Sequence, residues 1–154
     1  MSATWADRLA ARVDQDNQDR KTQDALKLRR DELLRSQGGG LWSGFVDEGR
    51  QGVNVVARRG KDNITCFEPN STTFKVENVT YPAISICAKL FVDGIELEYY
   101  RRKDATSEAE NDQKWVEFGL DDNDHLVLTC DGHRLLGKDE LLEFALGPPF
   151  RLRP

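Results

Sequence analysis

The spacing of hydrophobic and polar residues predicts that the chain begins with a long helix. Residues 3–36 contain neither Gly nor Pro and are rich in Ala, Leu, Arg and Gln, which favour helix. Either Ser2 or Thr4 could cap the first turn, and Asp7 suits the positive end of the helix dipole. The stretch Gln37-Gly38-Gly39-Gly40 predicts the end of this helix, because Gly is common at helix C-termini.

The apolar residues of this helix fall into two clusters with a wholly polar segment between them. Trp5, Leu9 and Val13 form an N-terminal stripe, and a second cluster lies within residues 25–34. Residues 14–24 contain no apolar side chain, a gap that a helix packed along its whole length would not tolerate. Either the helix docks through its C-terminal half and leaves its N-terminal half in solvent, or the stripe belongs to an arm that grips another chain.

A second helix is predicted over residues 41–58, where apolar residues recur at spacings of three and four. Three glycines weaken this prediction by about 1 kcal/mol each relative to Ala, and residues 53–56 could instead form a strand. We interpret the glycines as places where the helix lies close against another element.

From residue 63 onward the hydrophobic period changes to two, which is typical of strands. Strands are predicted at residues 63–68, 72–77, 83–92, 95–103, 113–120 and 125–130. A short helix is predicted over residues 138–146, and the sequence Gly-Pro-Pro-Phe that follows is expected to stop it.

Two turns allow the strand register to be predicted. Asp93-Gly94 is a strong two-residue hairpin signal, and a loop there places Val92 opposite Ile95 and Lys89 opposite Glu98. One face of this hairpin is then mainly apolar and the other mainly polar. The turn at residues 121–124 joins the next two predicted strands, 113–120 and 125–130. Their apolar faces match only if the loop between them has an odd number of residues. The dipeptide Asp131-Gly132 is expected to end the sheet.

Together these elements predict an α+β fold with a long N-terminal helix, a second helix, a five- or six-stranded antiparallel meander and a short C-terminal helix. The helices at 41–58 and 138–146 are expected to cover the inner face of the sheet. We divide the chain into an N-terminal helical arm (1–37), a single α+β domain (41–150) and a tail (151–154).

Composition and charge narrow the possible partners and compartment. Only 38% of the residues are hydrophobic and 32% are charged, so part of the chain must lie outside a core. Residues 104–154 carry 12 acidic and 5 basic side chains, which disfavours bulk binding to nucleic-acid phosphates. No apolar run has the length of a signal peptide or a membrane span, and the three cysteines suit a reducing interior. A cytoplasmic protein without membrane contact is therefore expected, and its three Asn-x-Thr triplets are ascribed to turns and strands.

The chain contains no Gly-rich phosphate loop, HExxH or CxxC motif, and we predict neither a cofactor nor a metal. His125, Cys130 and His133 offer zinc-ligand types, but strand alternation places His125 and Cys130 on opposite sheet faces. Cys130 and His133 could instead contribute to a ligand pocket or an enzyme site. Acidic residues at 121–124 could bind calcium, although their spacing is not that of an EF-hand.

The outer face of the predicted sheet carries aromatic side chains among charged ones: Phe91, Tyr100, Arg102 and Trp115. If Arg102 lies across from Trp115, a cation–π contact could hold the indole ring. Aromatic residues and Arg are typical of interface centres, so this face could bind a protein. The alternative is that the N-terminal helix simply covers these aromatic rings.

The sequence therefore favours a small protein-binding module, such as an adaptor, a chaperone-like protein, an immunity protein or an accessory subunit. It would dock through the sheet face or the N-terminal helix, onto another protein or a second copy of itself. A small-ligand binder or an enzyme using Cys130 and His133 is the first alternative. A nucleic-acid accessory factor is the second, and it would use the basic clusters at residues 58–61 and 101–103.

Overall fold

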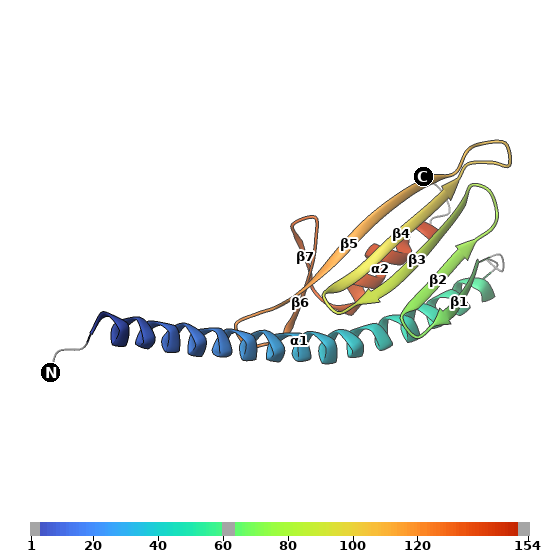
Figure 1. The fold of residues 1–154 in the computed structure, drawn as a ribbon. Coiled ribbons are helices and arrows are strands. Elements are labelled where there is room, and N and C mark those ends of the chain that lie inside the picture. The colour runs from blue at the N-terminus through green and yellow to red at the C-terminus, as the bar shows by residue number, and fades with distance from the viewer. Residues whose placement is uncertain (1–3, 60–63, 151–154) are drawn as a thin grey trace.

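The computed structural model, which describes residues 4–59 and 64–150, contains one long helix, one antiparallel sheet and a C-terminal helix (Figure 1). Seven strands pair in chain order as a simple meander. This confirms the α+β class with a long first helix and a short last one, but the strand count is seven rather than five or six. The elements are α1 (Trp5–Arg58), β1 (Ile64–Asn70), β2 (Thr73–Asn78), β3 (Ala83–Phe91), β4 (Gly94–Arg102), β5 (Glu110–Leu120), β6 (Leu126–Cys130), β7 (His133–Leu135) and α2 (Lys138–Phe150).

Helix α1 is continuous over 54 residues, so the predicted end at Gln37–Gly40 is wrong. Gly38 is buried where the helix crosses the sheet, and a Cβ there would lie 2.7 Å from the Phe118 ring. The glycine thus permits close packing rather than ending the helix. Trp42 and Phe45 follow on the buried side, and their burial outweighs a helix-propensity loss of about 1 kcal/mol per glycine. The tail at 151–154 and Ser2 lie outside the described residues.

The start of α1 is a capping box. Thr4 Oγ1 accepts a hydrogen bond from the Asp7 backbone N–H at 3.2 Å, and the Thr4 N–H donates to the Asp7 carboxylate at 3.2 Å. Thr4, one of the two predicted caps, therefore fixes where the helix begins.

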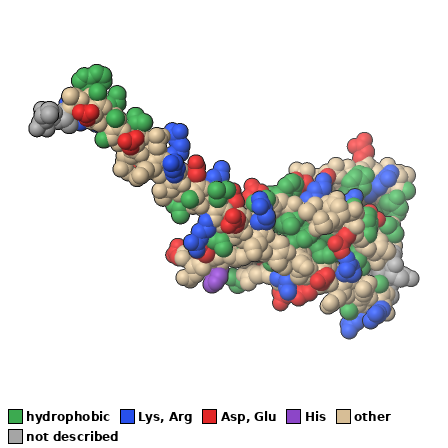
Figure 2. All heavy atoms as spheres, turned by 60° about the horizontal axis from the view of Figure 1, so that its bottom comes forward, with side chains coloured by type: hydrophobic (Ala, Val, Ile, Leu, Met, Phe, Trp, Pro, Cys, Tyr) green, Lys and Arg blue, Asp and Glu red, His purple; other side chains and the backbone are tan. Residues whose placement is uncertain are grey.

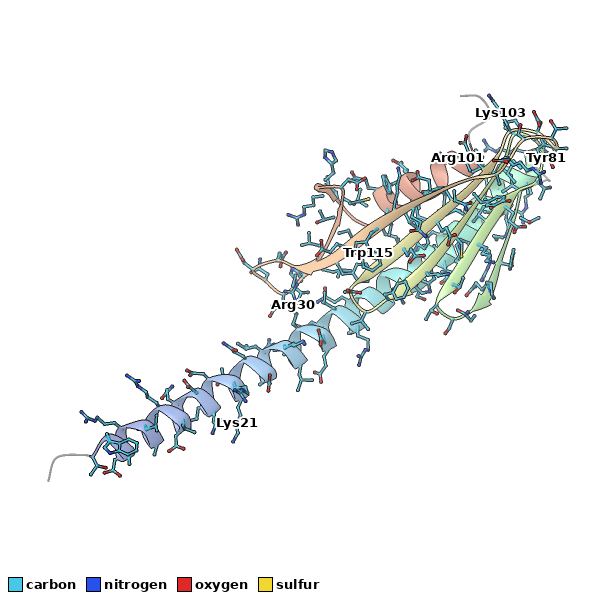
Figure 3. The ribbon with its side chains drawn as sticks, turned by 45° about the horizontal axis from the view of Figure 1, so that its top comes forward. Lys21, Arg30, Tyr81, Arg101, Lys103 and Trp115 are labelled. Atoms are coloured by element: carbon cyan, nitrogen blue, oxygen red, sulfur yellow. The ribbon has the colours of Figure 1, made fainter. Side chains whose placement is uncertain are left out.

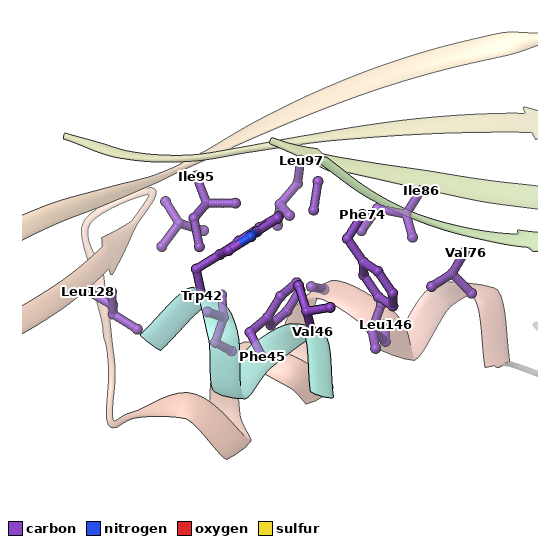
Figure 4. Close-up of a cluster of buried hydrophobic side chains, with 14 of the residues drawn as sticks. Trp42, Phe45, Val46, Phe74, Val76, Ile86, Ile95, Leu97, Leu128 and Leu146 are labelled. Atoms are coloured by element: carbon purple, nitrogen blue, oxygen red, sulfur yellow. The ribbon is translucent and has the colours of Figure 1, made fainter. Parts of the chain in front are cut away.

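The hydrophobic core lies between one face of the sheet and two helical segments, the second half of α1 and α2 (Figure 4). Trp42 stacks on Phe45 with ring centroids 5.6 Å apart, and Phe45 meets the edge of Phe74 at 6.1 Å. The Trp42 indole N–H also donates to the Ser71 carbonyl at 3.0 Å, which fixes α1 against the β1–β2 turn. Gly49 packs against Phe74 and Leu146, and Gly44 against Lys138, as the sequence interpretation expected, but a Cβ at Gly52 would meet nothing within 4 Å, so that glycine does not mark a close contact.

The β3–β4 hairpin keeps the predicted faces but not the predicted register. Its loop is Val92-Asp93, and Leu90 pairs with Ile95, two positions away from the predicted pairing. Gly94 belongs to β4, where it pairs with Phe91 and Glu117. A Cβ there would lie 2.4 Å from both Trp115 Cζ2 and the Val116 carbonyl oxygen, so this strand position requires glycine. A shift of two residues preserves which side chains point inward, since strand side chains alternate.

The remaining turns test the other register predictions. Leu120 pairs with Leu126 across a five-residue loop, which confirms that the β5–β6 connection has an odd length. Asp131 and Gly132 do not end the sheet, because both have positive φ (52° and 79°) and form a tight turn into β7.

Helix α2 extends to Phe150, so the predicted stop at Gly147-Pro148-Pro149-Phe150 is also wrong. A proline inside a helix leaves the carbonyl four residues earlier without its usual donor. For Pro148 and Pro149 these carbonyls belong to Phe144 and Ala145. The Tyr99 hydroxyl, from β4, donates to the Ala145 carbonyl at 2.8 Å and lies 3.4 Å from that of Phe144. The sheet thus supplies a donor to one of the two carbonyls, that of Ala145, which Pro149 leaves without one.

Candidate functional site

The first half of α1 projects from the body of the molecule (Figures 1 and 2). Every residue from Thr4 to Arg30 is exposed, and burial begins only at Asp31 and Leu34. At 1.5 Å per residue, the segment from Trp5 to Arg30 extends about 39 Å. We call this segment the arm.

The apolar stripe lies at the outer end of the arm. Trp5, Leu9 and Val13 are 73%, 52% and 50% exposed, and their spacing of four places them on one side of the helix. Figure 2 shows hydrophobic side chains gathered at this end. Most helical stability in proteins comes from packing, and the arm lacks packing along nearly all of its length, so it depends on local helix propensity and on the packed helix that it continues. A partner that covered the exposed stripe would add the packing that the arm lacks.

Charge is distributed unevenly along the arm. Asp14, Asp16 and Asp19 form an acidic segment beyond the stripe, whereas Lys27, Arg29 and Arg30 form a basic segment near the body. Lys21 and Arg30 project from α1 into open space (Figure 3). Arg29 makes an ion pair with Asp124 at 3.5 Å, but both side chains are largely exposed, so this pair contributes little to stability.

A second apolar surface lies where the arm enters the body. A hollow of about 380 Å³ is bounded by Leu34, Gly38 and Gly39 of α1 and by Leu90, Phe91 and Val92 of the β3–β4 hairpin. Arg35 and Thr72 complete its rim. We call this hollow the hairpin groove. Its α1 side was missed from sequence because the glycines were taken as a helix end.

Phe91 and Trp115, two of the predicted partner-binding residues, lie together beside the hairpin groove. Their ring centroids are 5.9 Å apart with an interplanar angle of 52°. Gly94 has no side chain, so the Trp115 indole lies directly over the β4 backbone. Both rings remain partly exposed and extend the apolar surface from the groove onto the outer face of the sheet.

Tyr100 and Arg102 lie at the other end of β4, so the predicted contact between Arg102 and Trp115 is wrong. Trp115 pairs with Glu96, whereas Arg102 pairs with Ala83. The Arg102 guanidinium donates to the carbonyls of Ser107 and Ala105 at 3.1 and 3.0 Å, which fastens the β4–β5 loop. The prediction failed because β5 begins at Glu110, three residues earlier than expected, and this sets a different register.

The outer face of the sheet is polar between these two ends. Lys89 of β3 pairs with Glu96 of β4, and neighbouring rows carry Lys75 and Glu98. Both α1 and α2 pack against the opposite face, and no described element covers this one (Figure 1). The N-terminal helix therefore does not cover the outer aromatic rings. Such a face needs no partner to be stable in water, since antiparallel sheets are often solvated on one side.

Cys130 and His133 are paired residues of the β6–β7 hairpin but do not form a reactive pair. Cys130 is 3% exposed, and burial raises the pKa of its thiol. A buried neutral thiol is a poor nucleophile. His133 is exposed on the other strand of the turn. Nothing in this geometry supports the alternative of a ligand pocket or an enzyme site at these two residues.

The acidic turn at residues 121–124 is organised by its own hydrogen bonds. The Asp121 carboxylate accepts from the backbone N–H groups of Asn123 and His125 at 2.8 and 2.9 Å, and these bonds, with that from His125 first, lower its pKa. Gln37 of α1 binds the same loop through the Asp124 carbonyl and the Leu126 N–H, each at 2.6 Å. Within residues 4–59 and 64–150, no three His, Cys, Asp or Glu side chains are arranged to hold a metal ion.

The basic clusters are only partly within the described chain. Arg58 ends α1 and Arg59 follows it, but Gly60 and Lys61 lie outside the described residues. Arg101 lies over the Tyr99 ring at 5.7 Å from its centroid.

None of the helices in the described ranges has an apolar stretch long enough to cross a bilayer.

Comparisons with protein-family models, with curated proteins and with solved structures gave no match, so a function must be inferred from the residues of this chain.

Proposed function

We propose that this chain is a protein-binding module that docks a macromolecular partner through its helical arm. The observation that carries this proposal is the exposed stripe of Trp5, Leu9 and Val13 at the outer end of an arm whose residues are all exposed and whose ion pair with the body, Arg29–Asp124, lies at the opposite end. Fully burying one large apolar side chain is worth about 1.5–3 kcal/mol, so covering all three would supply much of a stable association. Trp is also among the residues most often found at energetic centres of interfaces.

The hairpin groove and the Phe91–Trp115 pair provide a second contact surface for the same role. The two surfaces lie at opposite ends of the arm, so one elongated partner could contact both. We place the protein in a reducing compartment, the cytoplasm, because Cys66, Cys87 and Cys130 are unpaired thiols. Adaptor, chaperone-like, immunity and accessory-subunit roles all fit such a module.

The test is a variant in which the stripe is removed while the helix is retained: Trp5→Ala, Leu9→Ala and Val13→Ala. The matched control removes three side chains of the same segment that lie outside the stripe: Arg8→Ala, Gln15→Ala and Gln18→Ala. Both variants add alanines, which favour helix, so circular dichroism should show comparable helix content.

Site-specific photo-crosslinking from position 12, which lies beside Trp5 and Leu9 and is changed in neither variant, would identify what contacts the stripe in purified protein and in cells. We expect a defined macromolecular adduct that the control variant keeps and the stripe variant loses. If no defined adduct forms under either condition, the proposal fails.

A further inference from the structure

Building on the proposed function, we propose that the partner of the arm is a second copy of this chain. The stripe of one copy would lie against the hairpin groove of the other, with the two α1 helices antiparallel. The site is incomplete in one copy because its stripe and groove are about 27 residues apart on a single helix, a distance of about 40 Å, so they cannot meet within one chain.

The spacing of the two surfaces is what a two-fold arrangement needs. If two α1 helices cross at residues 22–23, Leu9 of one copy lies beside Ser36 of the other, and Trp5 lies beside Gly40. Leu34, Arg35, Gly38 and Gly39 of α1 line the hairpin groove, so Leu9 at the centre of the stripe arrives at the groove, with Trp5 and Val13 at its two ends. A two-fold axis makes every contact occur twice, which is how most homodimers bury a patch on each copy.

Charge complementarity selects this orientation. In the same register the acidic segment (Asp14, Asp16, Asp19) of one copy lies beside residues 26–31 of the other, which contain Lys27, Arg29 and Arg30 and one acid, Asp31. Asp16 is then level with Arg29, whereas Asp14 is level with Asp31, so the attractive pairs outnumber the repulsive one. Near the axis, Lys21 lies beside Asp24 of the second copy. A parallel pair in register would instead place Asp beside Asp and Arg beside Arg, which is unfavourable. The polar gap in the arm is then an electrostatic contact region between the two apolar ends.

One glycine of α1 fits the same arrangement. A Cβ added at Gly39, which lines the hairpin groove, would meet nothing within 4 Å in this chain, so packing within the chain does not require glycine there. This glycine nevertheless lowers helix stability by about 1 kcal/mol relative to Ala. A partner helix carrying the bulky Trp5 would benefit from a side-chain-free surface at this point, as closely packed helices do.

The mass of the full-length protein in solution is the first test. We expect sedimentation equilibrium to give twice 17.5 kDa for the wild-type chain at micromolar concentration. The stripe variant (Trp5→Ala, Leu9→Ala, Val13→Ala) should be monomeric under the same conditions, and the Arg8→Ala, Gln15→Ala, Gln18→Ala control should stay dimeric.

Charge reversal tests the orientation. Asp16→Lys with Asp19→Lys should raise the dimer dissociation constant at least tenfold, as should Lys27→Glu with Arg30→Glu. Combining all four changes should restore dimerisation, because the attractive pairs are rebuilt with opposite sign. Arg29 is left unchanged because it already binds Asp124.

The outcomes separate this inference from the proposed function. Dimerisation lost with the stripe and rescued by the combined reversal supports both. A monomer at all concentrations that still forms a stripe-dependent adduct with another protein overturns the self-association and leaves the protein-binding function standing. A dimer that is indifferent to the stripe, or no rescue by the combined reversal, also overturns the antiparallel pair. A monomer without any adduct overturns both proposals.

Discussion

The Tyr99 hydroxyl connects the sheet to a helix turn that would otherwise lack hydrogen-bond donors. Tyr99 is 1% exposed, and burial raises the pKa of its hydroxyl, which therefore stays protonated and able to donate. Its acceptors are the carbonyls of Ala145 and, at a longer distance, Phe144. Because Pro148 and Pro149 have no N–H to offer these groups, one side chain allows α2 to continue past residue 146.

We therefore expect Tyr99→Phe to lower the free energy of unfolding by about 1–3 kcal/mol, since it leaves a buried carbonyl without a donor. Urea denaturation followed by circular dichroism measures this change. Tyr100→Phe is the matched control: Tyr100 is the next residue but is exposed, so its loss of a hydroxyl should change stability by less than about 0.5 kcal/mol. Equal effects at the two positions would contradict the role given to Tyr99.

Gly94 is the second residue whose contacts decide the local structure. We expect Gly94→Ala to destabilise the fold by about 2 kcal/mol or more, because the added Cβ would lie 2.4 Å from the Val116 carbonyl oxygen, which cannot move without disturbing the β4–β5 ladder. Gly119→Ala in β5 is the control, since a Cβ there meets nothing within 4 Å. Thermal unfolding should show a lower midpoint for Gly94→Ala alone. Trp115 fluorescence should shift in the same variant, because the indole lies over Gly94.

At the scale of elements, local periodicity predicts most of this fold and fails where distant contacts decide. The strands and their inward faces follow from period-two alternation, and even a two-residue register error at the β3–β4 hairpin leaves those faces correct. Asn70 and Asn78 also close turns as expected, each accepting from the N–H two residues later, whereas Asn63 lies outside the described residues. These features depend on a few neighbouring residues, which the sequence displays directly.

The two wrong helix ends have the same physical cause, a contact with a residue far away in the sequence. Gly38 resembles a helix end locally, but its contact with Phe118, 80 residues away, makes it an interior helix residue. The end of α2 depends on Tyr99 in the same way. For the candidate site, the stripe was visible from sequence because it lies on one helix. The hairpin groove was not, because its two walls meet only after folding.

The β4–β5 loop is an element whose order should depend on pH. The Asp104 carboxylate accepts from the side chain and backbone of Thr106 and of Ser107, and these hydrogen bonds, led by that from the Thr106 side chain, lower its pKa. Because folding lowers the pKa of this carboxyl group, its ionised form stabilises the loop fully at pH values above the pKa of an unfolded Asp. That contribution is lost as the pH falls through the lowered, folded value.

We therefore expect the amide resonances of Thr106 and Ser107 to shift on acidification with a midpoint below that of an unstructured Asp. An NMR pH titration of the folded chain measures this midpoint. Asp104→Asn should abolish the transition, which would assign it to this carboxylate. A midpoint at or above that of unstructured Asp would show that the hydrogen bonds do not persist in solution.

At the scale of the whole molecule, one helix performs two different tasks. Residues 34–53 of α1 are part of the core and are held by the sheet, whereas the arm is held by its own hydrogen bonds, its capping box and one exposed ion pair, Arg29–Asp124. Stability along a helix need not be uniform, and segments without tertiary contacts open most readily. The arm should therefore be the part of α1 whose protection from amide hydrogen exchange depends on association with a second copy.

Amide hydrogen exchange across protein concentrations tests this expectation. In the Trp5→Ala, Leu9→Ala, Val13→Ala variant, we expect rapid exchange over residues 5–30 and slow exchange over residues 41–58 at every concentration. In the wild-type chain, protection over residues 5–30 should increase with concentration, because pairing of two arms adds the contacts that each lacks. Exposed residues around Ser36, where the second copy's stripe would arrive, should become protected in parallel. Protection of the arm that is independent of concentration would mean that the isolated helix is stable by itself, and the need for a partner would no longer follow from its exposure.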